Sequence, residues 1–488
     1  MHLRRFVAFG LIVILNLSFL SGCVKKDQPA TSKTDRVNLV FYSLFDDEDI
    51  YQPLIQQYSA KHPNVTITYR KFTDPVDYMN LIINELAEGQ GPDIFAAPNY
   101  WFLRNVKKVS PLPSITFSPQ QFQQTFVSVA NDDLVFTDPN DGQKKVYGIP
   151  LYVDTLALYY NKADFEDKLP SQGHPSSTWE GIKNDVFQLT KTDNSFERFQ
   201  VAGIAMGRSD NIARAVDILY MLMLQYKTNF YNSTLSQTAF VNQQTPTSTG
   251  LLINPASEAL RLYTSFALPS NKNYSWNEYL ANSASPVKEM ETFARGKVAM
   301  IFGYSYLYEQ IKAEINDLKG KGVNTIDPKD IQVSDVPQVN DPATSTENRV
   351  AFANYNALTV ARTTEHPAEA WDFLLFLSSK NNLQYYNSKT HEPTSRRDMI
   401  KDQMQDPIYG VFAEQTGYAQ SLPVYDYDRY NQIFAQAIDS VLATTSPQDA
   451  IRNAAAAIDA LLPTSGMAPA SSTTSRSSNP KSTQQNSS

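Results

Sequence analysis

The alternation of strand and helix patterns in the first hundred residues constrains the fold more than any other feature of the sequence. Residues 37–42 predict a mostly buried strand, and apolar residues at i, i+3, i+4 and i+7 from Tyr51 predict a helix after it. A second strand over 65–69 and a second helix with Tyr78 on its apolar face repeat the pattern, and residues 93–95 indicate a third strand. We therefore expect a parallel sheet with right-handed crossovers.

The remainder of the chain carries enough periodic segments for a second unit. The pattern becomes helix-rich after Pro150, and residues 211–224 are almost continuously apolar, which predicts a buried helix. Strand-like stretches return near 331–339 and over 350–360, and Pro367 then opens another helix. The fold class predicted from this alternation is α/β.

The periodic region ends with one more predicted helix, and a segment of different composition follows it. A last helix uses Ile451, Ala454, Ala455 and Ile458 on one face. Residues 463–488 are rich in Ser, Thr, Pro and Asn and contain nothing from which a core could be built. We expect this segment to be a disordered tail.

Charge limits the classes of partner. The chain of 488 residues carries 42 lysines and arginines against 50 aspartates and glutamates, a formal net charge of −8. It has no sustained basic run that could hold a phosphate backbone, so nucleic acid is not expected as a partner. A chain of this length can form two or three structural units.

The N-terminus has the order of a signal peptide. Arg4 and Arg5 precede an apolar run over residues 6–20, and the small residues Ser21 and Gly22 follow. The run is too short for a comfortable transmembrane span. We expect residues 1–22 to be a signal peptide, which places the mature protein outside the cytoplasm.

The only cysteine, Cys23, comes directly after this segment. Leu20-Ser21-Gly22-Cys23 resembles the lipobox of bacterial lipoproteins, and the resemblance implies cleavage before Cys23 and a lipid on its sulfur. Residues 23–35 would then form a polar tether to the cell membrane, with no other membrane contact. The alternative is a signal peptide without lipidation, followed by an incidental cysteine.

Five segments, in this order, resemble the family of extracellular solute-binding proteins that includes maltose-binding protein. They are Gly-Pro-Asp-Ile-Phe at 91–95, Ala-Leu-Tyr-Tyr-Asn-Lys at 157–162, Thr-Trp-Glu at 178–180, Phe-Ala-Arg-Gly-Lys-Val-Ala-Met at 293–300 and Ala-Trp-Asp-Phe-Leu at 370–374. Each is weak alone, but their order and spacing from about residue 37 to 462 are specific. In the third segment Ser177 and Glu180 have the spacing of a capping box.

The resemblance implies a periplasmic-binding-protein-like fold of two discontinuous α/β lobes, joined by a hinge with a ligand cleft between them. Lobe 1 would comprise residues 36–150 and 336–385, and lobe 2 residues 151–335 and 386–462. Closure of the cleft would bury a small solute, and the permease subunits of an ABC importer would distinguish closed from open protein. We expect a monomer.

The first candidate ligand-binding residues follow the strands of lobe 1. Asp46 and Asp47 lie after the first strand, where open α/β sheets bind ligands and where the family contacts sugar hydroxyls. The alternative is that they only favour the dipole of the next helix. Tyr100 and Trp101 match the family's next cleft loop, where a ring can stack on the C–H face of a pyranose.

The other candidates lie later in the chain. Asp154 occupies the position of an acidic ligand contact in the family, and a carboxylate can accept two hydroxyl hydrogen bonds. Tyr304 and Tyr306 stand where the family presents a stacking aromatic, with core packing as the alternative. Further candidates are Asn354 and Tyr355 on the next strand and Arg396 in a late loop, beside Arg397. Residues read as structural instead are Tyr160, Asn161, Trp179 and Trp371.

Enzyme and metal signatures are absent from the sequence. The five histidines are scattered, with no His-x-x-x-His or Cys-x-x-Cys spacing, and no Gly-x-Ser-x-Gly or Walker phosphate loop occurs. We expect no catalytic residue, metal or cofactor. The aromatic candidates favour a sugar or oligosaccharide as ligand. A peptide, polyamine or metal ligand, a surface glycoside hydrolase and an adhesive lipoprotein are the alternatives.

Overall fold

The computed structural model describes residues 36–138, 140–193, 198–247, 250–343 and 349–463. The predictions of a signal peptide, of a lipidated Cys23 and of a tether up to residue 35 lie outside these residues, as does all but the first residue of the predicted tail. None of the helices described in these ranges is long and apolar enough to cross a membrane.

The first sheet is built mainly from the N-terminal strands. Its strands are β1 (Val37–Leu44), β2 (Val65–Phe72), β3 (Ile94–Pro98), β6 (Ile149–Pro150) and β15 (Asn356–Val360), in the order β2-β1-β3-β15-β6. β1 is parallel to β2 and β3, which confirms the predicted parallel pairing. β15 is antiparallel to both of its neighbours, β3 and β6.

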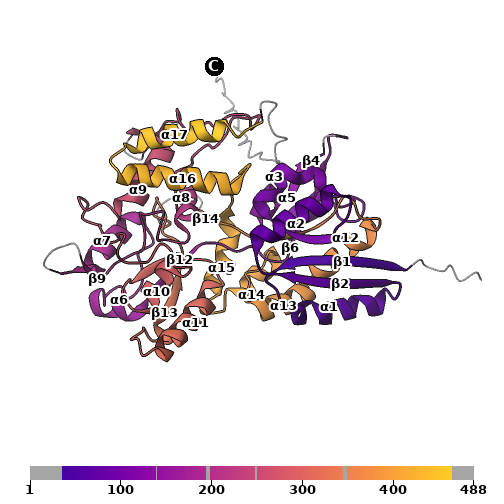
Figure 1. The fold of residues 1–488 in the computed structure, drawn as a ribbon, viewed down its shortest axis with the longest axis horizontal. Helices are drawn as coiled ribbons and strands as arrows, with labels where there is room; N and C mark the ends of the chain where they lie inside the picture. Colours follow the sequence, from indigo (N-terminus) through magenta and orange to yellow (C-terminus); the bar gives the residue numbers. More distant parts are fainter. Residues whose placement is uncertain (1–35, 139, 194–197, 248–249, 344–348, 464–488) are drawn as a thin grey trace, which may run out of the picture. The chain divides into compact units, whose positions relative to one another are not determined.

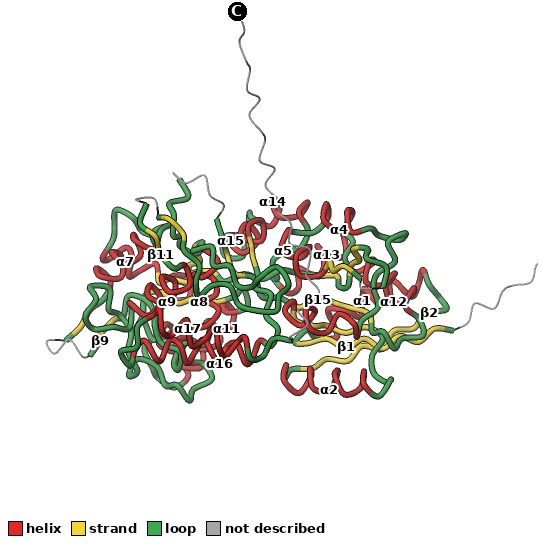
Figure 2. Tube along the Cα trace, turned by 90° about the horizontal axis from the view of Figure 1, so that it is seen from above, coloured by secondary structure: helices red, strands yellow, loops and turns green. Residues whose placement is uncertain are grey.

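Helices cover both faces of this sheet. They include α1 (Glu48–Lys61), α2 (Pro75–Ala87), α12 (Pro367–Leu377) and α13 (Lys380–Thr390). Figure 2 shows α2 on one side of the strands and α1, α12 and α13 on the other. The predicted apolar faces are the buried ones, since Tyr51 and Tyr58 of α1 and Tyr78 of α2 are buried. Asp74 caps α2 by accepting hydrogen bonds from two backbone N–H groups.

A second sheet contains the strands expected from the later motifs. β7 (Ala157–Asn161) lies between β12 (Met300–Gly303) and β13 (Ile331–Ser334) and is antiparallel to both. The helices of this region are α6 (Lys162–Lys168), α7 (Trp179–Leu189), α8 (Ala215–Gln225), α9 (Pro255–Ser265), α10 (Lys288–Ala294), α11 (Leu307–Gly320), α16 (Tyr427–Leu442) and α17 (Pro447–Asp459). α8 is buried along most of its length, as its apolar sequence predicts.

Shorter elements complete the fold. The helices are α3 (Phe102–Asn105), α4 (Pro119–Thr125), α5 (Ser128–Leu134), α14 (Ile400–Gln403) and α15 (Gly410–Gln415). The two-stranded pairs are β4 (Val135–Thr137) with β5 (Lys144–Val146), β8 (Lys191–Thr192) with β9 (Phe199–Val201), β10 (Thr245–Pro246) with β11 (Leu252–Ile253), and β14 (Ala351–Phe352) with β16 (Ala419–Gln420).

The predicted capping box at the start of α7 is wrong by one residue. The helix is capped by Thr178, whose hydroxyl accepts a hydrogen bond from the N–H of Gly181 at 3.1 Å. Ser177 cannot take that place because its carbonyl accepts from the N–H of Gln338 at 2.9 Å, so the chain stays extended up to Thr178.

Two hydrophobic cores organise the described chain, and each is discontinuous in sequence. The first core takes its buried residues from 37–153 and 353–399, together with Ala419, and the second core takes them from 156–352 and 409–462. Figure 1 shows the consequence in colour, because orange helices α12 and α13 accompany the indigo strands β1 and β2. The chain therefore passes between the cores several times. The bounds predicted for the lobes remain a prediction.

Candidate ligand-binding site

A cavity of about 500 Å³ is lined by side chains from both cores. Its aromatic lining consists of Phe45 and six tyrosines, Tyr100, Tyr152, Tyr304, Tyr306, Tyr355 and Tyr427. Its polar lining consists of Asp154, Arg214, Gln310, Asn354, Asn356 and Glu392. Leu44, Pro75 and Pro98 complete the wall. Apolar ring faces beside hydrogen-bonding groups suit a ligand that is itself amphipathic.

Asp154 lies in the wall of the pocket, in the segment that joins β6 to β7. The side chain is 2% exposed, and its carboxylate accepts hydrogen bonds from the N–H and hydroxyl of Ser305 at 3.0 and 2.8 Å and from the N–H of Thr155 at 2.8 Å. Its carbonyl accepts from the N–H of Asn354 at 3.1 Å. Burial raises the pKa of Asp154 above its ordinary value in spite of these donors. One residue thus connects three segments of the pocket wall.

Arg214 and Asp217, at the start of α8, hold the tyrosines of the second core. Arg214 donates a hydrogen bond to the hydroxyl of Tyr306, and its guanidinium lies 5.2 Å from the ring centroid of Tyr304. Asp217 accepts from the hydroxyl of Tyr304 at 2.9 Å and from that of Tyr427 at 2.7 Å. The carboxylate of Asp217 also lies 3.8 Å from Arg214. The guanidinium charge is therefore balanced within the wall.

Aromatic stacking joins the two cores beside the pocket. The rings of Tyr100 and Tyr427 stack with centroids 4.1 Å apart and an angle of 7° between their planes. The hydroxyl of Tyr427 accepts a hydrogen bond from the amide of Asn354 at 3.2 Å. Nearby, Arg104 forms an ion pair with Asp426 at 3.2 Å. These contacts hold the start of α16 against the loop after β3.

Tyr355 is oriented by a buried carboxylate behind the wall. Its hydroxyl donates to Asp133 at 2.8 Å, and the amide of Asn99 donates to the same carboxylate at 2.9 Å. The hydroxyl of Ser421 is a further donor to Asp133. Burial raises the pKa of Asp133 to about 6. With its hydroxyl committed, Tyr355 contributes mainly its ring to the pocket.

Glu392 brings a second carboxyl group to the cavity. Within the described chain its Oε2 atom is buried and has no hydrogen-bond partner. Burial raises the pKa of Glu392 well above its ordinary value, and the negative charges of Asp154 and Asp46 add to the rise. A protonated carboxyl group can donate as well as accept, so Glu392 offers a hydrogen-bonding atom that the fold itself leaves unused.

The structure brings six of the sequence-predicted residues to one cavity. They are Tyr100, Asp154, Tyr304, Tyr306, Asn354 and Tyr355. They come from loops that are far apart in the sequence. Their grouping at one cavity agrees with the expected cleft, and their contact with a ligand remains a prediction.

Four predicted residues do not line this cavity. Asp46 accepts hydrogen bonds from the hydroxyls of Tyr51 and Tyr386, each at 2.9 Å, and borders a smaller neighbouring cavity. Asp47 is exposed and pairs with Lys71 at 2.5 Å. The other two are Trp101, which packs edge-on against Phe95 and Phe102, and Arg396, which forms an ion pair with Asp398 and donates to the carbonyl of Ser378.

Sequence reasoning missed several lining residues. They are Phe45, Tyr152, Arg214, Gln310, Asn356, Glu392 and Tyr427. Arg214 could have been found, because it is the one charged side chain before Asp217 in the apolar stretch that starts at residue 211. Glu392 could not, because nothing in its local sequence distinguishes it from other acidic residues.

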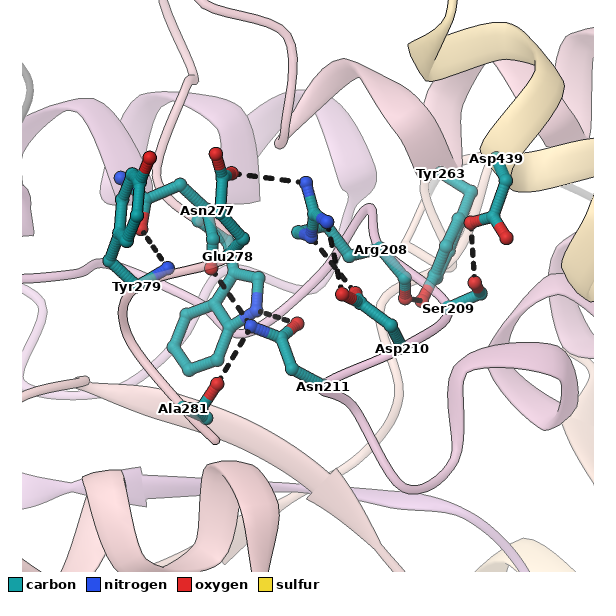
Figure 3. Close-up of polar contacts among 11 residues, drawn as sticks. Arg208, Ser209, Asp210, Asn211, Tyr263, Asn277, Glu278, Tyr279, Ala281 and Asp439 are labelled. Atoms are coloured by element: carbon teal, nitrogen blue, oxygen red, sulfur yellow. Dashed lines mark hydrogen bonds and ion pairs between the residues drawn. The ribbon is translucent and has the colours of Figure 1, made fainter. Parts of the chain in front are cut away.

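The loop that presents Arg214 is held by polar contacts of its own (Figure 3). Asn211 is fully buried, and its amide donates to the carbonyls of Asn277 and Ala281 at 2.9 and 3.3 Å. Its Oδ1 atom accepts from the indole N–H of Trp276 at 2.9 Å. Among the described residues, no group of three His, Cys, Asp or Glu side chains is placed so that it could hold a metal ion.

Replacing Asn211 with alanine should lower the free energy of unfolding by about 2–4 kcal/mol, because an indole N–H and two carbonyls would lose their partner in a buried place. Urea unfolding monitored by circular dichroism measures this. Ser209→Ala, which removes a hydrogen bond from Ser209 to Asp439 at the surface, is the matched control and should cost less than about 1 kcal/mol. Equal losses in the two variants would contradict the role given to Asn211.

Comparison with known proteins agrees with this architecture. The family model described as "Bacterial extracellular solute-binding protein" matches residues 53–409. A curated protein of Brucella abortus (strain 2308), whose name describes it as a binding protein, is 21% identical over 417 residues, which cover 84% of this chain and 89% of that protein.

Solved structures show the same fold. The sugar-binding protein MalE from Xanthomonas citri superposes with a TM-score of 0.68 at 14% identity, covering 87% of this chain and 97% of that one. A cyclo/maltodextrin-binding protein complexed with maltotetraose gives a TM-score of 0.66 at 16% identity, covering 88% and 98%. The predicted class, a periplasmic-binding-protein-like fold of two discontinuous α/β lobes, is confirmed. The chain belongs to the family of bacterial extracellular solute-binding proteins.

Proposed function

We propose that the protein captures a sugar or oligosaccharide in the cavity around Asp154 and delivers it to an ABC importer. The observation that carries the proposal is the lining itself. Six tyrosines from both cores surround one cavity, and carboxyl and amide groups stand between them. Ring faces fit the C–H faces of a pyranose, and the polar groups fit its hydroxyls.

The solved neighbours support this class of ligand. They include complexes with maltotetraose, with α-D-tagatose in a solute-binding protein of an ABC transporter from Thermotoga lettingae, and with mannotriose. At identities of 19% or less they support the class of ligand and not a particular sugar.

The mechanism we propose is closure of a cleft. Tyr306 belongs to the second core's side of the cavity, and Tyr355 belongs to the first core. A ligand that contacts both sides stabilises the arrangement in which they face each other, and the importer can recognise that arrangement. The proposal includes a lipid on Cys23, which would keep the monomeric protein at the outer surface of the cell membrane beside the permease.

The decisive experiment is a thermal-shift screen of the mature protein against mono- and oligosaccharides, amino acids, peptides, polyamines and metal ions. A compound at about 100 times its Kd adds about 2.7 kcal/mol of stability. A shift with sugars, with the sugar recovered unchanged, supports capture. A rise in melting temperature only with peptides, polyamines or metals would mean that the ligand is not a sugar. Recovery of cleaved sugar would indicate a glycoside hydrolase.

Tyr306 should be needed for affinity. Tyr306→Ala removes a ring that is 40% exposed beside the cavity, and we expect the Kd for the sugar that gives the largest shift to rise about 30-fold. Tyr306→Phe keeps the ring and should change the Kd less than about fivefold. Tyr279→Ala removes a tyrosine that is 83% exposed and lies outside the lining, so its Kd should match the wild type. Isothermal titration calorimetry distinguishes these outcomes.

A further inference from the structure

A small polar chamber adjoins the cavity at Glu392. Its volume is about 30 Å³, which is enough for one small polar group. Leu44, Phe45, Tyr152, Asn356 and Glu392 line both this space and the larger cavity, so the two lie side by side. We call the smaller space the side chamber. Its polar lining consists of Ser43, Asp46, Tyr51, Tyr152, Asn356, Tyr386 and Glu392.

The two carboxyl groups of the side chamber differ in their partners. Asp46 accepts hydrogen bonds from the hydroxyls of Tyr51 and Tyr386, each at 2.9 Å. Neither carboxyl oxygen of Glu392 forms a hydrogen bond or an ion pair with a described residue, and its Oε2 atom is buried. A buried carboxyl oxygen without a partner is unfavourable. The fold therefore satisfies Asp46 and leaves Glu392 unsatisfied.

The backbone of Glu392 is nevertheless held in place. Its carbonyl accepts hydrogen bonds from the side-chain amides of Asn387 at 3.0 Å and of Gln403 at 2.8 Å. Its N–H donates to the hydroxyl of Thr390 at 3.2 Å. The unpartnered carboxyl group is thus carried by an anchored segment and not by a loose loop.

The charges that act on Glu392 are negative. They are those of Asp154 and Asp46, which add to the effect of burial in raising the pKa of Glu392. Arg214 is the one lysine or arginine among the described residues that line either space, and its guanidinium lies 3.8 Å from the carboxylate of Asp217. The two spaces therefore hold three carboxyl groups and no cation that is left to balance them.

An ammonium group fits this place better than a hydroxyl group does. A sugar hydroxyl can donate one hydrogen bond to Glu392 but brings no charge. An ammonium group has three donors and a positive charge, and hydrogen bonds between charged partners are the stronger ones. The volume of the side chamber admits an amino group and is too small for an acetamido group.

We propose that the side chamber takes the ammonium group of an amino sugar, held between Glu392 and Asp46. The inference rests on the proposed function and names the class of sugar, which is one with a free primary amine. The sugar ring that carries the amine lies in the larger cavity. A neutral sugar leaves the carboxyl groups without a counter-charge, and an N-acetylated sugar does not fit the chamber.

The test uses three tetrasaccharides with one β-1,4-linked backbone. They are the tetramer of glucosamine, the tetramer of N-acetylglucosamine and cellotetraose, which differ only in the substituent at C2 of each ring. Isothermal titration calorimetry at pH 6, where most of the amines are charged, should give the glucosamine tetramer a Kd at least tenfold below that of the other two. Equal or tighter binding of either neutral tetramer overturns the inference.

Variants assign the preference to the side chamber. Glu392→Gln keeps the shape of the side chain and should raise the Kd for the glucosamine tetramer at least tenfold, and Asp46→Asn should raise it about fivefold. The control is Glu48→Gln, at an exposed carboxylate outside both linings, which should bind like the wild type. If Glu48→Gln weakens binding as much as Asp46→Asn, the preference reflects general attraction to an acidic protein and the inference is refuted.

Proton release gives a second readout that does not depend on affinity. Burial keeps Glu392 protonated at pH 6, and an ammonium group beside it favours the ionised form. Titrations in two buffers of different ionisation enthalpy should therefore show about one proton released per glucosamine tetramer bound. Glu392→Gln should release fewer protons than the wild type. Equal release in the two proteins contradicts the role given to Glu392.

A free cation and an amine on the ligand are distinguished by ammonium chloride, with potassium chloride at the same concentration as the control for ionic strength. If ammonium chloride alone raises the melting temperature of the wild type but not that of Glu392→Gln, the chamber holds a free ion and the inference is overturned. If a neutral sugar binds at least as tightly as the glucosamine tetramer, the inference fails and the proposed function stands. If no sugar raises the melting temperature in the wider screen, the proposed function fails as well.

Discussion

Asp154→Ala should lower the free energy of unfolding by about 3–5 kcal/mol in the absence of any ligand. The substitution leaves the N–H and hydroxyl of Ser305 and the N–H of Thr155 without their acceptor in a place that is almost inaccessible to water. Each orphaned donor costs about 1–3 kcal/mol. Urea unfolding curves of the two proteins, recorded at one pH, measure the difference.

Two control variants make this prediction specific. Asp47→Ala removes a carboxylate that is 71% exposed and paired only with Lys71, so it should cost less than about 1 kcal/mol. Asp154→Asn keeps one acceptor oxygen and should fall between the other two variants. A loss of less than about 1 kcal/mol in Asp154→Ala would mean that the Ser305 donors find other partners, and Asp154 would then be an ordinary polar residue of the wall.

The second large effect is a loss of stability as the pH rises. Glu289, in the first turn of α10, is 4% exposed and accepts hydrogen bonds from the N–H of Ala213, and burial raises its pKa from 4.5 to about 7. Between these two values the folded protein holds a proton that the unfolded chain has released. The contribution of Glu289 to stability therefore falls as the pH rises from about 4.5 to about 7 and does not change above that range. The contribution of this group is about 3 kcal/mol.

Chemical unfolding at pH 5, 6, 7 and 8 tests this sign and its assignment. Asp133, whose pKa burial raises to about 6, adds a change in the same direction at lower pH. Glu289→Gln cannot titrate and should make the decline between pH 5 and pH 7 shallower. Glu166→Gln, at a carboxylate that is 58% exposed, should leave the decline as in the wild type. If Glu289→Gln does not alter the decline in stability between pH 5 and pH 7, the decline comes from other titrating groups.

Much of the fold could be predicted from the spacing of apolar residues. The faces of α1 and α2 and the burial of α8 follow directly from their sequences, because helical and extended periods differ. The reversed direction of β15 could not be predicted in this way, since a strand has the same alternation whichever way it runs. The shift of the α7 cap from Ser177 to Thr178 also depends on a distant partner, Gln338, that no local pattern contains.

The candidate site was predictable at the level of loops and less so at the level of side chains. The loop after β1 was predicted to contact the ligand through Asp46 and Asp47, because carboxylates bind hydroxyls, and in the structure this loop lines the cavity through Phe45. The turn at Phe45, closed by the hydrogen bond from the N–H of Asp46 to the carbonyl of Leu44 at 2.8 Å, places neither carboxylate in the cavity lining. It directs Asp46 towards Tyr51 and Tyr386 and leaves the phenyl ring at the cavity. A single left-handed residue, Phe45 with a φ of 69°, thus decides which of three neighbouring side chains lines the cavity.

The position of β15 sets the order in which the protein can be completed during synthesis. β15 lies between β3 and β6, so the first sheet remains open in its middle until residues 356–360 have been made. By then the ribosome will have added about 200 residues of the second core. Until β15 has been made, the edge of β3 that pairs with it stays unpaired. The N-terminal third of the chain is therefore not a unit that folds ahead of the rest. If the chain is exported as proposed, a core that closes only late keeps the N-terminal part extended until most of the chain has been made.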